Sequence, residues 1–210
     1  MPPHLILASA SPGRRELLRR AGIEASVQAS GVDEDAVLST LRESVSELEP
    51  ADEVLALARA KAEDVAANAA DALVLGCDSM LELDGEVHGK PADAATAIAR
   101  WQRMRGNRGV LHTGHWLIDN RLGGSAGLIG ATASTIVHFA DIDDAEIAAY
   151  VATGEPLRVA GAFTIDGLGG PFVERIEGDH TTVVGLSLPL LRALLAELGL
   201  HWRDLRTSAH

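Results

Sequence analysis

The spacing of apolar residues changes along the chain, and it predicts helices and strands in alternation. Apolar residues three or four positions apart predict helices at 14–21, 52–70, 93–104, 144–152 and 188–198. Short apolar or alternating runs predict strands at 4–8, 25–29, 73–75, 110–118, 131–139, 159–165 and 172–176. Residues 80–88 read as a hairpin turning on Asp84-Gly85, and 33–35 as an acidic loop. We therefore expect an α/β fold, a mixed sheet with flanking helices.

The chain shows no break that would divide it into separate domains. Its 210 residues contain no internal repeat, low-complexity tract or Pro/Ser-rich linker. At about 150 residues per domain, this length allows one large domain or two small lobes. We expect a single domain over 1–210, with two lobes around a shared cleft as the alternative arrangement.

Composition and charge narrow the classes of partner. Aromatic residues make up only 3% of the chain, which predicts an aliphatic core and argues against a base-stacking surface for nucleic acid. The formal net charge of −12 argues further against binding a nucleic acid polymer, although a few placed cations can still bind a small anion. Cys77 is the only cysteine, and no apolar run reaches the length of a membrane span. We expect a cytoplasmic location and no membrane partner.

The segment from Ser9 to Arg15 has the features of an anion site. Ser11 is a good helix N-cap, and Pro12 suits the first helical position. The first turn then carries Arg14 and Arg15, whereas acids normally occupy this end of a helix. An anion held between these cations and the helix N-terminus explains the pattern. The alternative is a surface turn in which Arg15 pairs with an acid such as Glu16.

Lysine is rare in this chain, and its two positions stand out. Only Lys61 and Lys90 are lysines, although Lys and Arg together number 18. A compact, flexible ammonium differs chemically from a guanidinium, so these positions are candidates for ligand contact. Lys61 lies on an otherwise apolar helical stripe, where the alternative is a packed stem with its charge in solvent. Lys90 follows Gly89 in a tight turn.

Two carboxylates are candidates for catalysis or metal binding. Asp78 follows the predicted strand 73–75, and ligands of open α/β sheets bind at such carboxyl ends. A carboxylate there binds a divalent cation or accepts a proton from water, but it equally caps a turn. Glu34 in the acidic loop is a second possible metal ligand, although such loops are usually only solvated.

Ten short segments follow one another in order over nearly the whole chain. They are Leu7-Ala8-Ser9-Ala10-Ser11-Pro12, Val32-Asp33-Glu34, Ala60-Lys61-Ala62, Gly76-Cys77-Asp78-Ser79, Gly89-Lys90-Pro91, His112-Thr113-Gly114, Gly154-Glu155-Pro156, Ala160-Gly161-Ala162-Phe163, Phe172-Val173-Glu174 and Val184-Gly185-Leu186. Taken together, these segments resemble the Maf family of nucleoside triphosphate pyrophosphatases. The resemblance implies an elongated cleft between two lobes, as in inosine triphosphatases. It also implies hydrolysis of a nucleoside triphosphate to the monophosphate and pyrophosphate with Mg²⁺ or Mn²⁺, removing modified or surplus nucleotides.

The resemblance also assigns roles by position. Asp78 falls on the family's catalytic carboxylate, and Glu34 falls on a further acidic site residue. We expect these two carboxylates to be the metal ligands. The positions at which the family binds the triphosphate are occupied by Ser9, Ser11, Arg14, Lys61 and Lys90. A homodimer is the expected assembly. The competing functions are a nucleotide-binding regulator of cell division or septum formation with little turnover, and a broad inosine-triphosphatase-like activity.

Three departures from the family concern substrate choice. Gly13 stands where the family frequently has an arginine, and Ser79 where subgroups have Thr or Gln. Asp166 replaces the Gln of the dTTP/UTP type, and an ionised carboxylate only accepts hydrogen bonds. We expect activity spread over several triphosphates without an exclusive dTTP/UTP preference. The alternative is that Asp166 points to solvent or metal and reads no base.

Overall fold

The computed structural model describes residues 2–45 and 48–206, and it contains a mixed sheet. The strands are β1 (Leu5–Ala8), β2 (Ala25–Val27), β3 (Leu73–Leu83), β4 (Glu86–His88), β5 (Arg108–Asp119), β6 (Leu128–Phe139) and β7 (Val173–Glu177). They are hydrogen-bonded in the order β2-β1-β3-β5-β6-β7, with β4 also on β3. β1 is parallel to β2 and β3, whereas the β3–β4 and β6–β7 pairs are antiparallel. The predicted α/β class with a mixed sheet is confirmed.

Helices flank the strands. All five predicted helices are present, one of them with the predicted ends (144–152) and four with shifted ends. The α-helices are α1 (Pro12–Arg20), α2 (Glu34–Ser44), α3 (Pro50–Ala66), α4 (Ala94–Met104), α5 (Asp144–Ala152), α6 (His180–Val184), α7 (Leu188–Glu197) and α8 (Trp202–Leu205). Three 3-10 turns follow α5, at Pro156–Arg158, Ala160–Ala162 and Gly170–Phe172. The hairpin turning on Asp84-Gly85 is also confirmed, as the β3–β4 pair.

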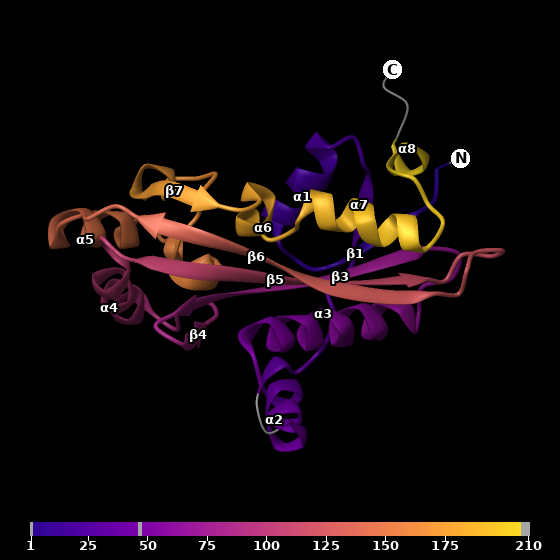
Figure 1. Cartoon of the computed structure of the whole chain (residues 1–210), viewed down its shortest axis with the longest axis horizontal. Coiled ribbons are helices and arrows are strands. Elements are labelled where there is room, and N and C mark those ends of the chain that lie inside the picture. The colour runs from indigo at the N-terminus through magenta and orange to yellow at the C-terminus, as the bar shows by residue number, and fades with distance from the viewer. Residues whose placement is uncertain (1, 46–47, 207–210) are drawn as a thin grey trace. The chain divides into compact units, whose positions relative to one another are not determined.

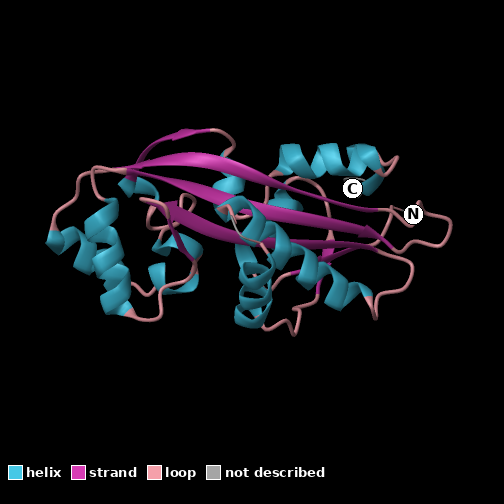
Figure 2. Ribbon diagram, turned by 60° about the horizontal axis from the view of Figure 1, so that its bottom comes forward, coloured by secondary structure: helices cyan, strands magenta, loops and turns pink. Residues whose placement is uncertain are grey.

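The chain divides into two compact units, each with its own core. Unit 1 comprises the described parts of 1–78, 113–133 and 185–210, and unit 2 comprises 79–112 and 134–184. In unit 1, α3 covers one face of the strands, and α1 and α7 cover the other (Figures 1 and 2). Whether 1–210 behaves as a single domain stays a prediction.

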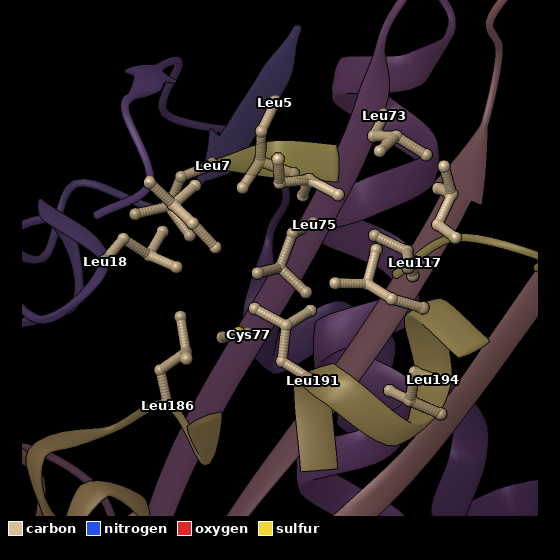
Figure 3. Packing of buried hydrophobic residues seen from close by; sticks show 14 residues of the cluster. Leu5, Leu7, Leu18, Leu73, Leu75, Cys77, Leu117, Leu186, Leu191 and Leu194 are labelled. Carbon is tan, nitrogen blue, oxygen red and sulfur yellow. The ribbon is translucent and has the colours of Figure 1, made fainter. Parts of the chain in front are cut away.

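The core of unit 1 is aliphatic on both faces of its strands. Leu5 and Leu7 of β1 and Leu75 of β3 point toward α1 and α7, where they meet Leu18 and Leu191 (Figure 3). The alternate residues of the same strands pack toward α3; they are Ile6, Ala8 and Val74. Since successive strand side chains point to opposite faces, burial on both sides gives the continuous apolar runs seen in the sequence.

Two glycines let α3 lie directly on the strands of unit 1. A Cβ at Gly76 of β3 would lie 2.0 Å from the Ala58 carbonyl oxygen, and one at Gly114 of β5 would lie 2.3 Å from that of Val54. No side chain fits at either position, so the backbones approach closely. This contact fixes where the middle of α3 meets β3.

The core of unit 2 is aromatic, which corrects the expectation of a purely aliphatic core. In this core the indole ring of Trp101 contacts the rings of Phe139, Tyr150 and Phe172 edge to face, with ring centroids 5.5–5.8 Å apart. Phe163 joins them, so five of the seven aromatic residues gather here. Although the chain has few aromatic residues, most of them lie together in unit 2 and form its core.

The strand predicted at 159–165 is wrong. The segment forms the 3-10 turn Ala160–Ala162 and then an irregular stretch. Gly161 and Ala162 have φ values of 72° and 64°, a left-handed conformation that interrupts a strand. Ala162 and Phe163 are nevertheless buried, because they pack into the core of unit 2. The neighbouring strand prediction, 172–176, corresponds to β7, which pairs with β6.

The acidic loop predicted at 33–35 is the start of a helix. Asp33 caps α2, its carboxylate accepting a hydrogen bond from Ala36 N, and Glu34 and Asp35 lie in the first turn. Carboxylates at this end of a helix are favoured by its dipole. The helices α6 and α8 were also not predicted. Within the described residues, no helix combines the length and the apolar character needed to cross a membrane.

Candidate functional site

Three of the predicted site residues meet in unit 1 at the contact of α3 with β3. Lys61 of α3 donates a hydrogen bond from Nζ to Asp78 Oδ1 at 2.5 Å. The same Nζ lies 2.7 Å from Oε1 of Glu34, the first residue of α2. The side chains of Lys61 and Asp78 are each only 11% exposed, whereas that of Glu34 is 53% exposed. One ammonium thus joins two carboxylates from different elements.

This geometry rejects two of the alternatives. Lys61 does not extend its charge into solvent, because its ammonium is buried between the two carboxylates. Asp78 does not cap a turn, and it does not lie at the end of a strand either: β3 continues to Leu83. The strand was predicted to end too early because Gly76 and Asp78 are poor strand formers. Gly76 is required at this position by the contact with α3.

The surroundings of Asp78 raise its pKa. Burial is the largest cause, since it disfavours the charged form. Lys61 and Arg14 lower the pKa of Asp78, and the charge of Glu34 raises it. The net direction is upward, so Asp78 is a better proton acceptor than an exposed aspartate while Lys61 stabilises its ionised form.

Arg14 is buried and bonded within the protein. Its guanidinium donates to Ser9 Oγ at 2.8 Å, to the Cys77 carbonyl at 2.8 Å and to the Gly185 carbonyl at 2.6 Å. It therefore fixes the hydroxyl of Ser9 and the peptide that precedes Asp78. The observed bonds give Arg14 a positioning role, and its contact with a substrate stays a prediction.

The start of α1 is open to solvent beside this cluster of bonds. Ser11 is the N-cap, as predicted, and Gly13 lies in the first turn. Arg15 is exposed, and its side chain has no ion-pair or hydrogen-bond partner within 2–45 and 48–206. Glu16 instead bonds Arg19 and Arg20, so the alternative pair Arg15–Glu16 is wrong. An open hollow of about 490 Å³ lies against this face of α1.

The remaining predicted residues belong to unit 2. The turn that carries Lys90 is held by its neighbour, because the Gly89 carbonyl accepts hydrogen bonds from Arg100 Nη1 at 2.7 Å and from Gly161 N at 3.2 Å. Lys90 itself is exposed, and so is Asp166. Ser79 follows Asp78 in β3, and alternation along a strand points its side chain to the opposite face. Their roles toward a substrate stay predictions.

The carboxylate pair fits a divalent cation held jointly with a phosphate ligand. No group of three or more His, Cys, Asp or Glu side chains arranged to hold a metal occurs in the part of the chain that the structure describes. Asp78 and Glu34 do place one carboxylate oxygen each within hydrogen-bond distance of a single atom, Lys61 Nζ. Mg²⁺ commonly uses one or two carboxylates, with phosphates and waters completing its shell.

Sequence reasoning missed the groups that hold the site in place. They are Gly76 and the carbonyls of Cys77 and Gly185. A glycine inside an apolar strand is a detectable signal of close backbone approach. Backbone carbonyls leave no such signal. Cys77 is buried, and burial raises the pKa of its thiol to about 12, which disfavours the thiolate that a nucleophile needs.

Comparisons with a family model and with known proteins agree on one family. Residues 4–198 match the family model described as Maf-like protein. The chain is 61% identical to a nucleoside triphosphate pyrophosphatase of Salinispora tropica, covering 95% of this chain and 86% of that protein. It is 56% identical to one of Streptomyces coelicolor, covering 93% and 90%. It is 54% identical to one of Nostoc punctiforme, covering 94% of each.

Solved structures give more distant matches. The Staphylococcus aureus Ham1 protein aligns with a TM-score of 0.40 at 13% identity, covering 96% of this chain and 93% of that one. A nucleoside-triphosphatase, dITP/XTP pyrophosphatase, of Mycobacterium abscessus aligns with a TM-score of 0.34 at 12% identity, covering 93% and 94%.

Proposed function

The chain belongs to the Maf-like protein family, and on that premise we propose that it hydrolyses nucleoside triphosphates to the monophosphate and pyrophosphate. Relatives at 50–61% identity over more than nine-tenths of the chain carry the name nucleoside triphosphate pyrophosphatase. The observation that carries the proposal is the buried contact of Lys61 with Asp78 and Glu34. It combines a carboxylate of raised pKa with a cation, the two groups that this hydrolysis needs.

Asp78 is the proton acceptor of the proposed reaction. A water oxygen forms a bond to the α-phosphorus, and the bond from that phosphorus to the bridging oxygen breaks. The bridging oxygen leaves with the β- and γ-phosphates as pyrophosphate. The carboxylate of Asp78 takes the proton of the water, and its raised pKa brings it closer to the pKa that general base catalysis favours.

The cations and hydroxyls bind the phosphates. An ammonium has three N–H donors, and Lys61 uses two of them on Asp78 and Glu34. The third points to no acceptor among residues 2–45 and 48–206, so it serves a phosphate oxygen. Lys90 supplies a second ammonium. Ser9 and Ser11 supply hydroxyls beside the N-terminus of α1, and Arg14 holds Ser9 in position.

Mg²⁺ or Mn²⁺ is part of the proposal, with Asp78 and Glu34 as its protein ligands. When bound, such an ion polarises the α-phosphate and lowers the pKa of a water.

Base choice is assigned to Gly13, Ser79 and Asp166. Gly13 removes a long cationic side chain, which leaves space beside the phosphates. An ionised Asp166 accepts hydrogen bonds from the amino groups of cytosine or guanine, but it meets the carbonyls of thymine or uracil unfavourably. Activity over several triphosphates is therefore proposed. The cytoplasm is the proposed location, and a homodimer stays a prediction.

Incubation with a panel of triphosphates and Mg²⁺ tests the function. We expect monophosphate and pyrophosphate in equal amounts. Release of orthophosphate would identify a phosphatase instead, and tight binding without any product would favour the regulatory alternative.

The Asp78→Asn variant tests the assignment of the base. We expect kcat to fall by roughly 100-fold or more, because the proton acceptor is lost, while the melting temperature stays close to that of the parent chain. Asp35→Asn, which removes an exposed carboxylate next to Glu34, is the matched control and should retain activity. Near-normal turnover of Asp78→Asn would remove Asp78 from the chemistry.

A further inference from the structure

The segment 164–169 in unit 2 is irregular, yet it is firmly held. It contains no helix or strand, and it carries the exposed Asp166. Such a segment has few backbone hydrogen bonds of its own; Gly170 N to the Gly167 carbonyl, at 3.1 Å, is one of them. Other groups must satisfy its remaining polar atoms. Most of these groups belong to one side chain, that of Glu155, which directly precedes the 3-10 turn Pro156–Arg158. Tyr150 supplies a further acceptor.

The carboxylate of Glu155 accepts four hydrogen bonds. Oε1 accepts from Thr164 Oγ1 at 2.5 Å, from Tyr150 Oη at 2.9 Å and from Gly169 N at 3.0 Å. Oε2 accepts from Leu168 N at 3.0 Å. Burial raises the pKa of Glu155, but these hydrogen bonds together lower it by a larger amount, so the pKa lies below its ordinary value. The acceptor is therefore ionised at neutral pH, and it binds both ends of the segment that carries Asp166.

The segment also fits closely around this acceptor. A Cβ at Gly167 would lie 2.6 Å from Glu155 Oε2, and one at Gly169 would lie 2.3 Å from Tyr150 Oη. Tyr150 Oη additionally accepts a hydrogen bond from Thr164 N at 3.2 Å. The two glycines let the backbone wrap around the carboxylate and the phenol. The backbone path through Asp166 is thus determined by the side chains of Glu155 and Tyr150, around which the segment packs.

Asp166 contrasts with this interior. Its side chain is exposed and makes no hydrogen bond or ion pair with any residue that the structure describes. Nothing on the side chain itself fixes where its carboxylate points. Its position depends on the backbone from Thr164 to Gly169, and that backbone is bonded to Glu155.

We propose that Glu155 is the positioning residue that sets the base preference of this site, by holding Asp166 in a fixed place. The inference rests on the proposed function and on the assignment of base choice to Asp166. In Glu155→Gln, an amide –NH₂ replaces one of the two acceptor oxygens. That group then faces backbone N–H donors, which repel it, so the segment opens while the size of the side chain is kept.

The test compares four chains: the parent, Glu155→Gln, Asp166→Asn and the double variant. The quantity is the ratio of kcat/KM for CTP to that for UTP. We expect a shift of about fivefold or more in Glu155→Gln, in the same direction as in Asp166→Asn. The double variant should match Asp166→Asn alone, because Glu155 acts through Asp166. Glu146→Gln, an exposed carboxyl on α5, is the matched control.

Two further measurements separate the possible failures. Hydrogen exchange should be faster by about tenfold or more at the amides of Leu168 and Gly169 in Glu155→Gln, since their acceptor is weakened. The dissociation constants of α,β-methylene CTP and UTP give the same preference ratio without turnover. Faster exchange with an unchanged ratio would overturn the inference. So would a ratio that Glu155→Gln still shifts in the Asp166→Asn background. If both analogues bind but CTP and UTP give no product, the proposed hydrolysis is contradicted. The ratio of dissociation constants would still test the role of Glu155.

Discussion

At the scale of single residues, the ammonium of Lys61 contacts two carboxylates at once. Lys61 bonds Asp78 in the buried interior and Glu34 near the surface. Because Lys61 opposes the effect of burial on Asp78, its charge keeps this carboxylate ionised at lower pH than burial alone would allow.

The variant Lys61→Met keeps most of the stem and removes this charge. The pKa of Asp78 should then rise further, so the acid limb of the pH profile of kcat/KM should move to higher pH. Arg59→Met, an exposed cation on the same helix, is the control and should leave the profile in place. An unchanged profile in Lys61→Met would show that the ammonium does not act on Asp78, and a mere loss of thermal stability would indicate a structural role for the stem.

Sequence reasoning worked well for side chains that are rare or chemically out of place. Lys61 was found because lysine is scarce and because its helical stripe is apolar. It did not predict the internal hydrogen bonds of Arg14, which the sequence placed in an anion site at a helix N-terminus. Its acceptors include the Gly185 carbonyl, 171 positions away, and no local pattern reports a contact over that separation.

At the scale of elements, the site depends on how closely α3 approaches β3. Gly76→Ala would place a methyl group 2.0 Å from the Ala58 carbonyl, one turn of α3 before Lys61. We expect the free energy of unfolding to fall by about 1–3 kcal/mol or more, as in other overpacked interiors, and activity to fall with it. Chemical denaturation measures the first quantity. Gly31→Ala is the control, since its Cβ would meet nothing within 4 Å.

The loop from β5 to β6 depends on Asp119, whose side chain is fully buried. Arg121 donates to both of its oxygens at 2.8 and 2.9 Å, and Ser125 donates from N and Oγ at 2.7 and 2.8 Å. The hydrogen bonds from Arg121 are the main reason that the pKa of Asp119 lies far below that of an exposed aspartate. Asp119 therefore stabilises the fold above about pH 4, and this contribution is lost as the pH falls through the folded-state pKa.

Asp119→Asn should lower the free energy of unfolding at pH 7 by about 3 kcal/mol, since it leaves Arg121 without its partner. The difference from the parent chain should shrink as the pH falls below 4. Urea denaturation at pH 7, 5 and 3 measures it. A difference that is independent of pH would show that the charge of Asp119 contributes nothing.

The helices and strands themselves were predictable where the spacing of apolar residues was regular. Long amphipathic helices such as α4 and the buried strands of unit 1 were found. The prediction failed at α2, whose capping residue and acidic first turn resemble a solvated loop, and at 159–165, where apolar residues are buried without a strand. In the second case tertiary packing around Trp101, which donates to the Ala162 carbonyl at 2.8 Å, decides the backbone.

At the scale of the whole molecule, two cores of different composition share three strands. β3, β5 and β6 each contribute residues to both units, so the units are continuous through these strands. We expect cooperative unfolding. Hydrogen exchange with increasing urea should reach the same opening free energy in peptides from 73–77 of unit 1 and 97–104 of unit 2. Two clearly separate values would contradict the prediction of a single domain over 1–210.

The most direct test of the central claim is the position of attack on the nucleotide. Hydrolysis is carried out in water enriched in ¹⁸O with Mg²⁺, and both products are examined by mass spectrometry. If Asp78 activates water for attack on the α-phosphorus, one ¹⁸O enters the monophosphate and none enters the pyrophosphate. Label in the pyrophosphate, or release of labelled orthophosphate, would place the attack on another phosphorus and contradict the proposed reaction.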